Sequence, residues 1–284
     1  MLSLTCATHT DIAQLQQLMR LVFDDDQSFL EALFSLKFND NVLIYKERKI
    51  IAAMAFLLPA HIRIEGNLLP ITYIYACATH PNYRNQGLMS SLVDKIWQVA
   101  CTRHEVGVFL RPASDSLFRY YEKQGFYTFF CGNKQILDLE PYKNLPNRYI
   151  LSSLSAADYY FWRTQFSLFC PDNYVIHWDI EHLELVAAHP EFGEAGYYAF
   201  RENGQTVAIA CIQHDALHID VAELLLCTDD VHFESIYQSM SQNFNTKNIT
   251  LFTCGQAIPI GMIKTNPTFV LPIEPLGYMA LGIE

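Results

Sequence analysis

Hydrophobic positions change their spacing along the first 140 residues, and each spacing predicts a different element. Apolar residues three and four apart predict a helix that ends at Phe23, namely Ile12, Leu15, Leu18 and Met19. A cap at Thr8 or Thr10 is expected at its start, and the aspartates at 24–26 separate it from a second helix through about Leu36. The pattern therefore begins with a short strand, "LSLTCAT", and two helices.

Two hairpins are predicted next, because runs of β-branched and aromatic residues flank short polar turns. The turns fall at residues 47–49 and 65–67, and the second hairpin ends in the strand "ITYIYACAT". The pattern then predicts a helix over 88–102, a strand over 106–113, a helix over 116–124 and two strands within 126–140. Hairpins and helices in this order predict an α+β fold with a mixed sheet.

The order of elements starts again after the segment "EPYKNLPNR". "FRENGQTVAIACI" repeats the hairpin pattern of "YKERKIIAAMAF", and "FESIYQSMSQNF" repeats the helix that begins near residue 88. Few residues are identical, so the repeat is one of element order. We therefore predict two tandem α+β domains, at 1–145 and 146–284. The second lacks the glycine turn "HPNYRNQGL" of the first and has only "TDDVHF" in its place.

Charge and cysteine content exclude some function classes. With 19 Lys and Arg against 30 Asp and Glu, the net charge is −11, which disfavours a nucleic-acid surface and suits a cationic small molecule or a basic peptide. The eight cysteines include no CxxC pair, which predicts reduced thiols, no metal site and a cytoplasmic protein. No membrane span is expected, because the longest apolar run, "IIAAMAFLLPA", is too short.

The glycine turn before residue 88 carries the strongest functional signal. Amide N–H groups at a helix N-terminus lack intrahelical partners, and Gly87 lets a ligand approach the backbone closely. Together with the helix dipole and Arg84, these donors form an anion site that needs no net positive charge. Neither a P-loop nor a dinucleotide fingerprint is present, so the turn belongs to another class of phosphate site.

The turn resembles the first motif of the GNAT acyltransferase superfamily, Arg/Gln-x-x-Gly-x-Gly/Ala between a strand and a helix. The matching positions are Arg84, Gly87 and Met89, of which Met89 departs from the usual small residue. "LFRYYEKQGF" resembles a second GNAT motif, in which a tyrosine, here Tyr121, precedes a glycine by four residues. The "Arg-x-x-Gly-Leu" variant and the tandem domains are similar to the enhanced-intracellular-survival (Eis) type, without its third, sterol-carrier-like domain.

This resemblance implies an N-acetyltransferase that uses acetyl-CoA as co-substrate and transfers the acetyl group directly in a ternary complex. The strand before the turn would bind the pantetheine arm through the backbone of Cys77, Ala78 and Thr79, with the Cys77 side chain only packing. The same backbone would polarise the thioester carbonyl. The diphosphate would rest on the amides of the turn, namely Arg84, Asn85, Gln86, Gly87, Leu88, Met89 and Ser90.

The resemblance also implies catalytic residues. Tyr121 would be the general acid, because a phenol keeps its proton at neutral pH and can protonate a departing thiolate; the alternative is that Tyr121 or its neighbour Tyr120 simply packs. In the Eis type the terminal carboxylate enters the active site, which here implies the α-carboxylate of Glu284 as base; a tail that ends at the surface is the alternative. His80 would shuttle protons or cap a turn.

The expected acceptor is an amine of a small molecule or a basic peptide, and the resemblance to the Eis type implies a homo-oligomer. The aspartates at 24–26 would attract a polyamine or aminoglycoside, or simply be solvated. Two other functions stay open: a non-catalytic acyl-CoA-binding module, and a tandem-GNAT aminoacyl transferase that uses charged tRNA. The acidic charge and the retained glycine turn disfavour the second.

Overall fold

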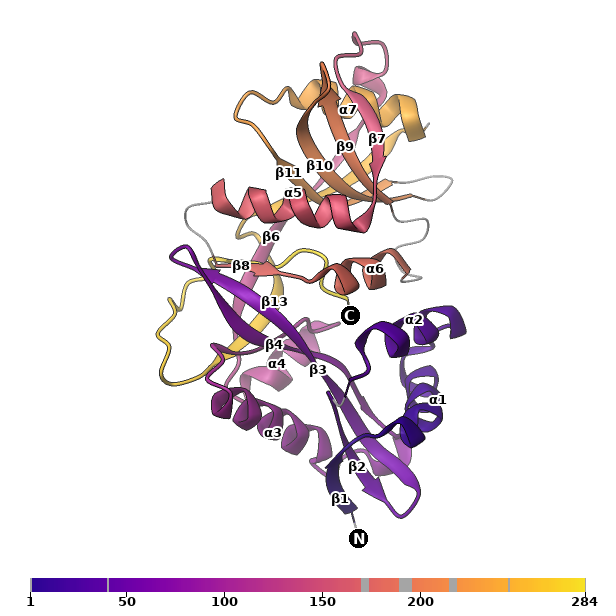
Figure 1. Cartoon of the computed structure of the whole chain (residues 1–284), viewed down its shortest axis with the longest axis vertical. Helices are drawn as coiled ribbons and strands as arrows, with labels where there is room; N and C mark the ends of the chain where they lie inside the picture. Colours follow the sequence, from indigo (N-terminus) through magenta and orange to yellow (C-terminus); the bar gives the residue numbers. More distant parts are fainter. Residues whose placement is uncertain are drawn as a thin grey trace.

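The computed structural model describes residues 2–39, 41–169, 174–188, 196–214, 219–244 and 246–283, with the backbone alone for 166–169. A single mixed sheet runs along the whole elongated molecule, and helices cover both of its faces (Figure 1). The predicted α+β class with a mixed sheet is confirmed.

The first half of the chain contains the elements that the sequence pattern predicts. In order they are β1 (Leu2–Cys6), α1 (Ile12–Phe23), α2 (Gln27–Lys37), β2 (Val42–Glu47), β3 (Ile50–Ile64), β4 (Asn67–Thr79), α3 (Leu88–Thr102), β5 (Gly107–Leu110), α4 (Asp115–Glu122) and β6 (Tyr127–Asp138). The two strands expected within 126–140 are one long strand, β6, because β13 pairs with it up to Gly132 and β12 pairs with it from Gly132 onward.

The second half repeats this order with changes. Its elements are β7 (Ile150–Leu154), α5 (Ala156–Phe169), β8 (Tyr174–His177), α6 (Ile180–Ala188), β9 (Gly196–Glu202), β10 (Gln205–His214), β11 (Ile219–Leu226), α7 (Phe233–Phe244), β12 (Asn248–Cys254), β13 (Ile258–Thr265) and β14 (Gly277–Tyr278). The helix predicted from "FESIYQSMSQNF" is α7, and the repeated hairpin is β9 and β10.

The acidic run between the first two helices has a local structural role. Asp24 ends α1 in the left-handed conformation, with φ of 62°. Asp26 begins α2, because its carboxylate accepts a hydrogen bond of 2.7 Å from the amide of Phe29. Two of the three aspartates therefore serve as helix boundaries, as their preference for such positions predicts.

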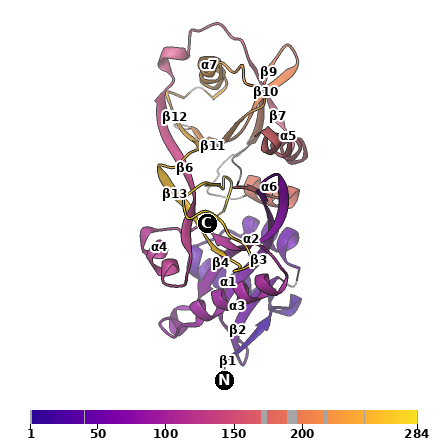
Figure 2. The same ribbon diagram turned by 90° about the vertical axis from the view of Figure 1, so that its left-hand side faces the viewer.

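The strand order shows that the two halves share the sheet. The order is β1-β2-β3-β4-β5-β13-β6-β12-β11-β10-β9-β7, so β13 lies between β5 and β6 of the first half. Strand β6 also extends into the second half and pairs with β12 from Asp138↔Asn248 to Gly132↔Cys254. In Figure 2, β6 and β13 lie side by side where the two halves meet. The domain boundary at residue 145 stays a prediction, and strands from both sides of it pair with each other.

The C-terminal segment, residues 277–283, runs between the two halves and is held by side chains along its length (Figure 1). Four consecutive carbonyl oxygens, of residues 280 to 283, each accept a hydrogen bond from a different side chain: Trp178 Nε1, His182 Nε2, Arg111 Nη1 and the Tyr73 hydroxyl. Burial lowers the pKa of His182 to about 3, so its ring is neutral and Nε2 carries the proton that it donates. The donors come from both halves, so the segment joins them.

We expect Trp178→Phe to weaken this attachment. The indole N–H lies 2.7 Å from the carbonyl oxygen of Ala280, and the variant leaves that buried oxygen without its donor while also removing ring atoms from a fully packed position. The free energy of unfolding should fall by about 2 kcal/mol or more, measured by urea denaturation.

The matched control is Trp162→Phe, which shortens a half-buried tryptophan on α5. Its unfolding free energy should change by less than about 1 kcal/mol. Equal losses in the two variants would show that the contact between Trp178 and the C-terminal segment contributes nothing.

Candidate functional site

Strand β4 has two neighbouring strands, and it separates from one of them at the site. On one side it pairs with β3 as far as Thr79. On the other side it pairs in parallel with β5 only at Thr72↔Val108 and Tyr73↔Phe109. In the described part of the chain, no strand pairs with the edge of Cys77–Thr79 that faces β5. The sheet therefore opens between β4 and β5.

A β-bulge directs the end of β4 away from β5. The register shift places two residues of β4, Ala76 and Cys77, opposite the single residue Ala55 of β3. Ala76 has a φ of 51°, in the left-handed region that residues with a Cβ rarely adopt. Such a bulge bends the strand that contains it, and here it does so next to the glycine turn.

The opening is a cavity of about 240 Å³ that reaches both faces of the sheet. Some of its lining belongs to the core beneath α3, namely Ile74, Cys77, Met89, Leu110, Leu117, Tyr120 and Tyr121. Other lining residues belong to the core beneath α1, namely Tyr73, Tyr75, Ala76 and Ile283, and Phe23 extends this group at the end of α1. Arg111, Pro112 and Ala113 line it after β5. Two molecules can therefore meet in the cavity from opposite faces.

The glycine turn lies at the α3 side of this cavity and has the geometry that the sequence predicts. Gly87 precedes the first helical residue with a φ of 73°, and Asn85 is also left-handed, with φ of 62°. A Cβ at Gly87 would meet nothing within 4 Å, so the backbone there is open to an incoming group. Among the described residues, none accepts a hydrogen bond from the backbone amides of residues 85–90. These amides are available to an anion.

Two side chains connect the turn with the rest of the site. Arg84 is exposed, and its Nε donates to the carbonyl oxygen of Thr79 at 3.3 Å, which keeps the guanidinium beside the end of β4. The hydroxyls of Ser90 and Tyr120 are 2.9 Å apart. Tyr120 therefore contacts the turn, whereas the sequence suggested that one of the two neighbouring tyrosines merely packs.

Tyr121 extends from α4 to the bulge of β4. It is 6% exposed, and its hydroxyl is hydrogen-bonded to the thiol of Cys77. Burial, and then the neighbouring Cys77, raise the pKa of Tyr121 well above its usual value. Burial also raises the pKa of the Cys77 thiol to about 12. Both groups therefore keep their protons at neutral pH, so Tyr121 can donate a proton and Cys77 is a poor nucleophile.

The end of the chain approaches the same cavity. Ile283 lines it, is buried, and its carbonyl oxygen accepts the hydrogen bond from Tyr73. Glu284, which the resemblance suggests as base, lies outside the described residues. Of the predicted site residues, Cys77, Met89 and Tyr121 line this opening in the sheet, and the segment that leads to Glu284 reaches it. The glycine turn adjoins the opening through Met89.

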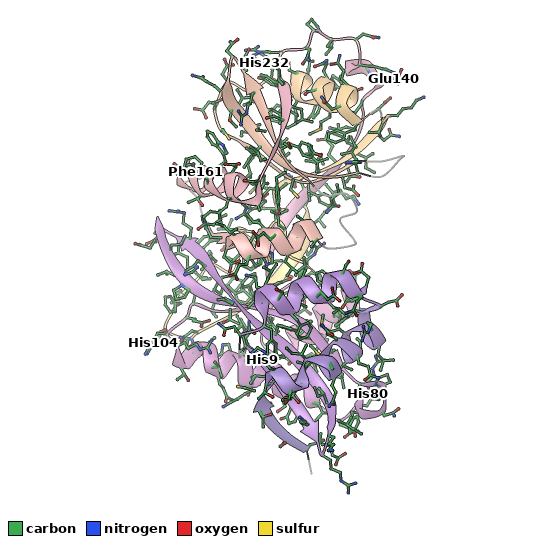
Figure 3. All side chains as sticks on the ribbon, turned by 45° about the vertical axis from the view of Figure 1, so that its right-hand side comes forward. His9, His80, His104, Glu140, Phe161 and His232 are labelled. Carbon is green, nitrogen blue, oxygen red and sulfur yellow. The ribbon has the colours of Figure 1, made fainter. Side chains whose placement is uncertain are left out.

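His80 has a structural contact. Its Nδ1 accepts a hydrogen bond of 3.3 Å from the amide of Asn82, so it caps the short turn after β4. Figure 3 shows His80 at the surface, near the end of the molecule formed by the first half. Among the described residues, no three His, Cys, Asp or Glu side chains are grouped as metal ligands would be. The expected absence of a metal stays a prediction.

Four residues that line the cavity were not predicted from the sequence, namely Phe23, Tyr73, Tyr75 and Arg111. The alternation in "ITYIYACAT" could have placed Tyr73 and Tyr75 on the face opposite Ile74. Phe23 and Arg111 have no comparable signal, because each reaches the cavity through the ends of elements that are distant in sequence.

No helix in the described ranges has both the length and the apolar character needed to cross a membrane.

Several solved structures share this fold. A GCN5-related N-acetyltransferase from Anabaena variabilis is 12% identical, with a TM-score of 0.79 over 94% of this chain and 74% of its own. A conserved protein from Enterococcus faecalis, described as a probable N-acyltransferase, is 12% identical, with a TM-score of 0.77 over 95% of this chain and 74% of its own. Eis1 from Mycobacterium abscessus is 12% identical, with a TM-score of 0.61 over 88% of this chain and 65% of its own. At these identities the likeness shows the fold.

No protein of curated function matches the sequence. The family model described as acetyltransferase (GNAT) domain matches residues 4–129, which include β4, the glycine turn, α3 and Tyr121. That match identifies residues 4–129 as an acetyltransferase (GNAT) domain, and the solved structures share the fold of the chain.

Proposed function

We propose that this protein is an N-acetyltransferase, which transfers the acetyl group of acetyl-CoA to the amine of a small molecule or basic peptide. One observation carries the proposal: the open edge of β4 at Cys77–Thr79 leads directly to the unsatisfied amides of the glycine turn. An extended arm that ends in a diphosphate fits these two features together, because one offers strand-like pairing and the other offers anion donors.

The turn fits the diphosphate of acetyl-CoA on geometric grounds. The left-handed conformations of Asn85 and Gly87 turn successive amides to the same side, and the lack of a Cβ at Gly87 leaves them accessible. Arg84 and Ser90 flank these amides with a cation and a hydroxyl. The backbone of Cys77, Ala78 and Thr79 would hold the pantetheine arm, with Leu88 and Met89 packing below the turn.

Tyr121 is the proposed general acid. The reaction forms a bond between the amine nitrogen and the acetyl carbon and breaks the bond between that carbon and the CoA sulfur. The departing thiolate needs a proton, and the Tyr121 hydroxyl is placed at Cys77, beside the strand that would carry the thioester. Its raised pKa means that the proton is present throughout the neutral range.

Glu284 remains the proposed general base, on the resemblance to the Eis type. The supporting observation is that the preceding residue, Ile283, lines the cavity and that its carbonyl oxygen accepts a hydrogen bond from Tyr73. A cytoplasmic location and a homo-oligomer likewise remain proposals. The non-catalytic module is the second candidate, and the tests below separate it from the enzyme.

The first prediction concerns the glycine turn. Gly87→Val should abolish CoA binding, because a branched side chain both obstructs the approach to the amides and is strained at a φ of 73°. Calorimetry should show an increase of at least about 100-fold in the Kd for CoA, which corresponds to losing about two charge-assisted hydrogen bonds.

Gly204→Val is the control, since Gly204 has φ of 82°, an open Cβ position and a place in the β9–β10 hairpin. It imposes the same kind of strain far from the turn and should leave the Kd for CoA unchanged. CoA binding that survives Gly87→Val would show that the diphosphate lies elsewhere.

The second prediction separates the two tyrosines. Tyr121→Phe should lower kcat by about 100-fold or more while the Kd for CoA stays constant, because only the proton donor is lost. Tyr120→Phe should change the Kd for CoA rather than kcat, because its hydroxyl contacts Ser90 in the turn.

A thiol-release assay combined with calorimetry measures both. An unchanged kcat in Tyr121→Phe would remove its catalytic role, and the absence of any thiol release by the unmodified protein would favour the non-catalytic module.

The third prediction tests direct transfer. Because burial raises the pKa of Cys77 to about 12, the reactive thiolate is scarce at pH 7 to 9. Incubation with acetyl-CoA alone should therefore leave the protein without an added acetyl group in intact-mass spectra. Acetylation of Cys77 that disappears when an amine is added would establish a two-step mechanism instead.

A further inference from the structure

This inference rests on the proposed function and concerns the acceptor. The cavity between β4 and β5 reaches the face of the sheet that α1 covers, opposite the face with the glycine turn. The donor would occupy the α3 side, so the acceptor amine must approach through the α1 side. The side chains there therefore select the acceptor.

The α1 side of the cavity is apolar and rich in aromatic rings. Tyr73 and Tyr75 stack at 6.2 Å between ring centroids, and both are nearly fully buried. Ile283 completes this wall, fixed by the hydrogen bond from Tyr73. Phe23 stands at the edge with 40% of its surface exposed. A ligand body that covers Phe23 and reaches the tyrosines would be stabilised by removing apolar surface from water.

Charge in the cavity opposes a polycation. Among the described lining residues, Arg111 is the one that is charged, and it is a cation. A positive charge on the acceptor beyond the reacting amine would face Arg111 in a partly desolvated space, where repulsion is strong. The charge of the cavity lining is therefore opposite in sign to the net charge of the whole protein, and the lining charge is the one that acts on the acceptor.

The size of the cavity limits the acceptor further. Its volume of about 240 Å³ is below the ~300–1,000 Å³ of typical pockets for drug-sized ligands, and the thioester end of the donor needs part of it. An aminoglycoside or an extended peptide segment would extend beyond this volume into solvent, whereas one ring or a short branched chain with a single amine can be enclosed.

From lining, charge and size together, we infer that the acceptor is a small monoamine with an aromatic or similarly apolar body, which Phe23, Tyr73 and Tyr75 contact. The nitrogen would lie at the opening beside the bulge at Ala76, and the body would extend toward Phe23 at the entrance. Phe23 is then a specificity residue that contacts substrate without taking part in proton transfer.

The test compares two amines as acceptors for acetyl-CoA, 2-phenylethylamine and spermidine, in the thiol-release assay with the full chain. The kcat/KM for 2-phenylethylamine should exceed that for spermidine by at least about tenfold. Phe23→Ala should raise the KM for 2-phenylethylamine by about tenfold, with little change in kcat and none in the Kd for CoA.

Leu21→Ala is the matched control, because Leu21 is another exposed apolar residue of α1, at 54% exposure, and does not line this cavity. It should leave KM unchanged. A preference for spermidine, or a KM that Phe23→Ala does not alter, would overturn the inference while acetyl transfer itself stands. No thiol release with either amine would also overturn this inference. No release with a panel of small amines and basic peptides, by a protein that binds CoA, would overturn the proposed enzyme as well.

Discussion

The site depends on one feature of the backbone: the pairing of β4 with β5 ends at Tyr73, and β4 then bulges at Ala76. An unbroken parallel ladder between these strands would close the sheet, and the edge of Cys77–Thr79 would be paired within the protein. The left-handed Ala76 bends β4 beyond the last pair and costs backbone strain of about 1–2 kcal/mol. The rest of the structure compensates, because β3 pairs with β4 on its other edge and Tyr121 contacts the bulged segment from α4.

The second half has a similar break but a different use for it. Strand β11 bulges at Ala222 and pairs with β12 only as far as Val221↔Leu251. Two residues further on, Glu223 is fully buried and bound by Arg163 at 2.9 Å and by the Tyr159 hydroxyl at 2.8 Å. An ion pair with further hydrogen bonds can be retained in such a low-dielectric position. The protein's own buried groups thus occupy one face of this second break, and a cavity of about 230 Å³ lined by Ala222, Phe252 and Thr253 lies on the other.

Local spacing in the sequence was sufficient for most elements of the first half and for the glycine turn, but not for the cavity or for elements such as α5 and α6. The helical period of Leu15, Leu18 and Met19 led directly to α1, and Gly87 marked the left-handed residue before α3. The bulge at Ala76 could not be predicted, because "ITYIYACAT" contains no glycine or proline that would mark it. Nor could the C-terminal segment be placed, since Tyr73 and Ile283 are 210 residues apart and meet only in the folded chain. Contacts of that kind are decided by tertiary packing.

The position of β13 has a consequence for how the protein is made. This strand pairs with β5 through contacts such as Gly107↔Thr265, and with β6 on its other side. On the ribosome, the N-terminal half therefore emerges with a gap in its sheet that residues 258–265 fill later. Such a high contact order slows folding and leaves the edges of β5 and β6 exposed to aggregation until β13 has been synthesised. The cavity beside β5 is thus completed only after the second half has emerged, and residues 4–129 are not a unit that can be separated from the residues that follow them.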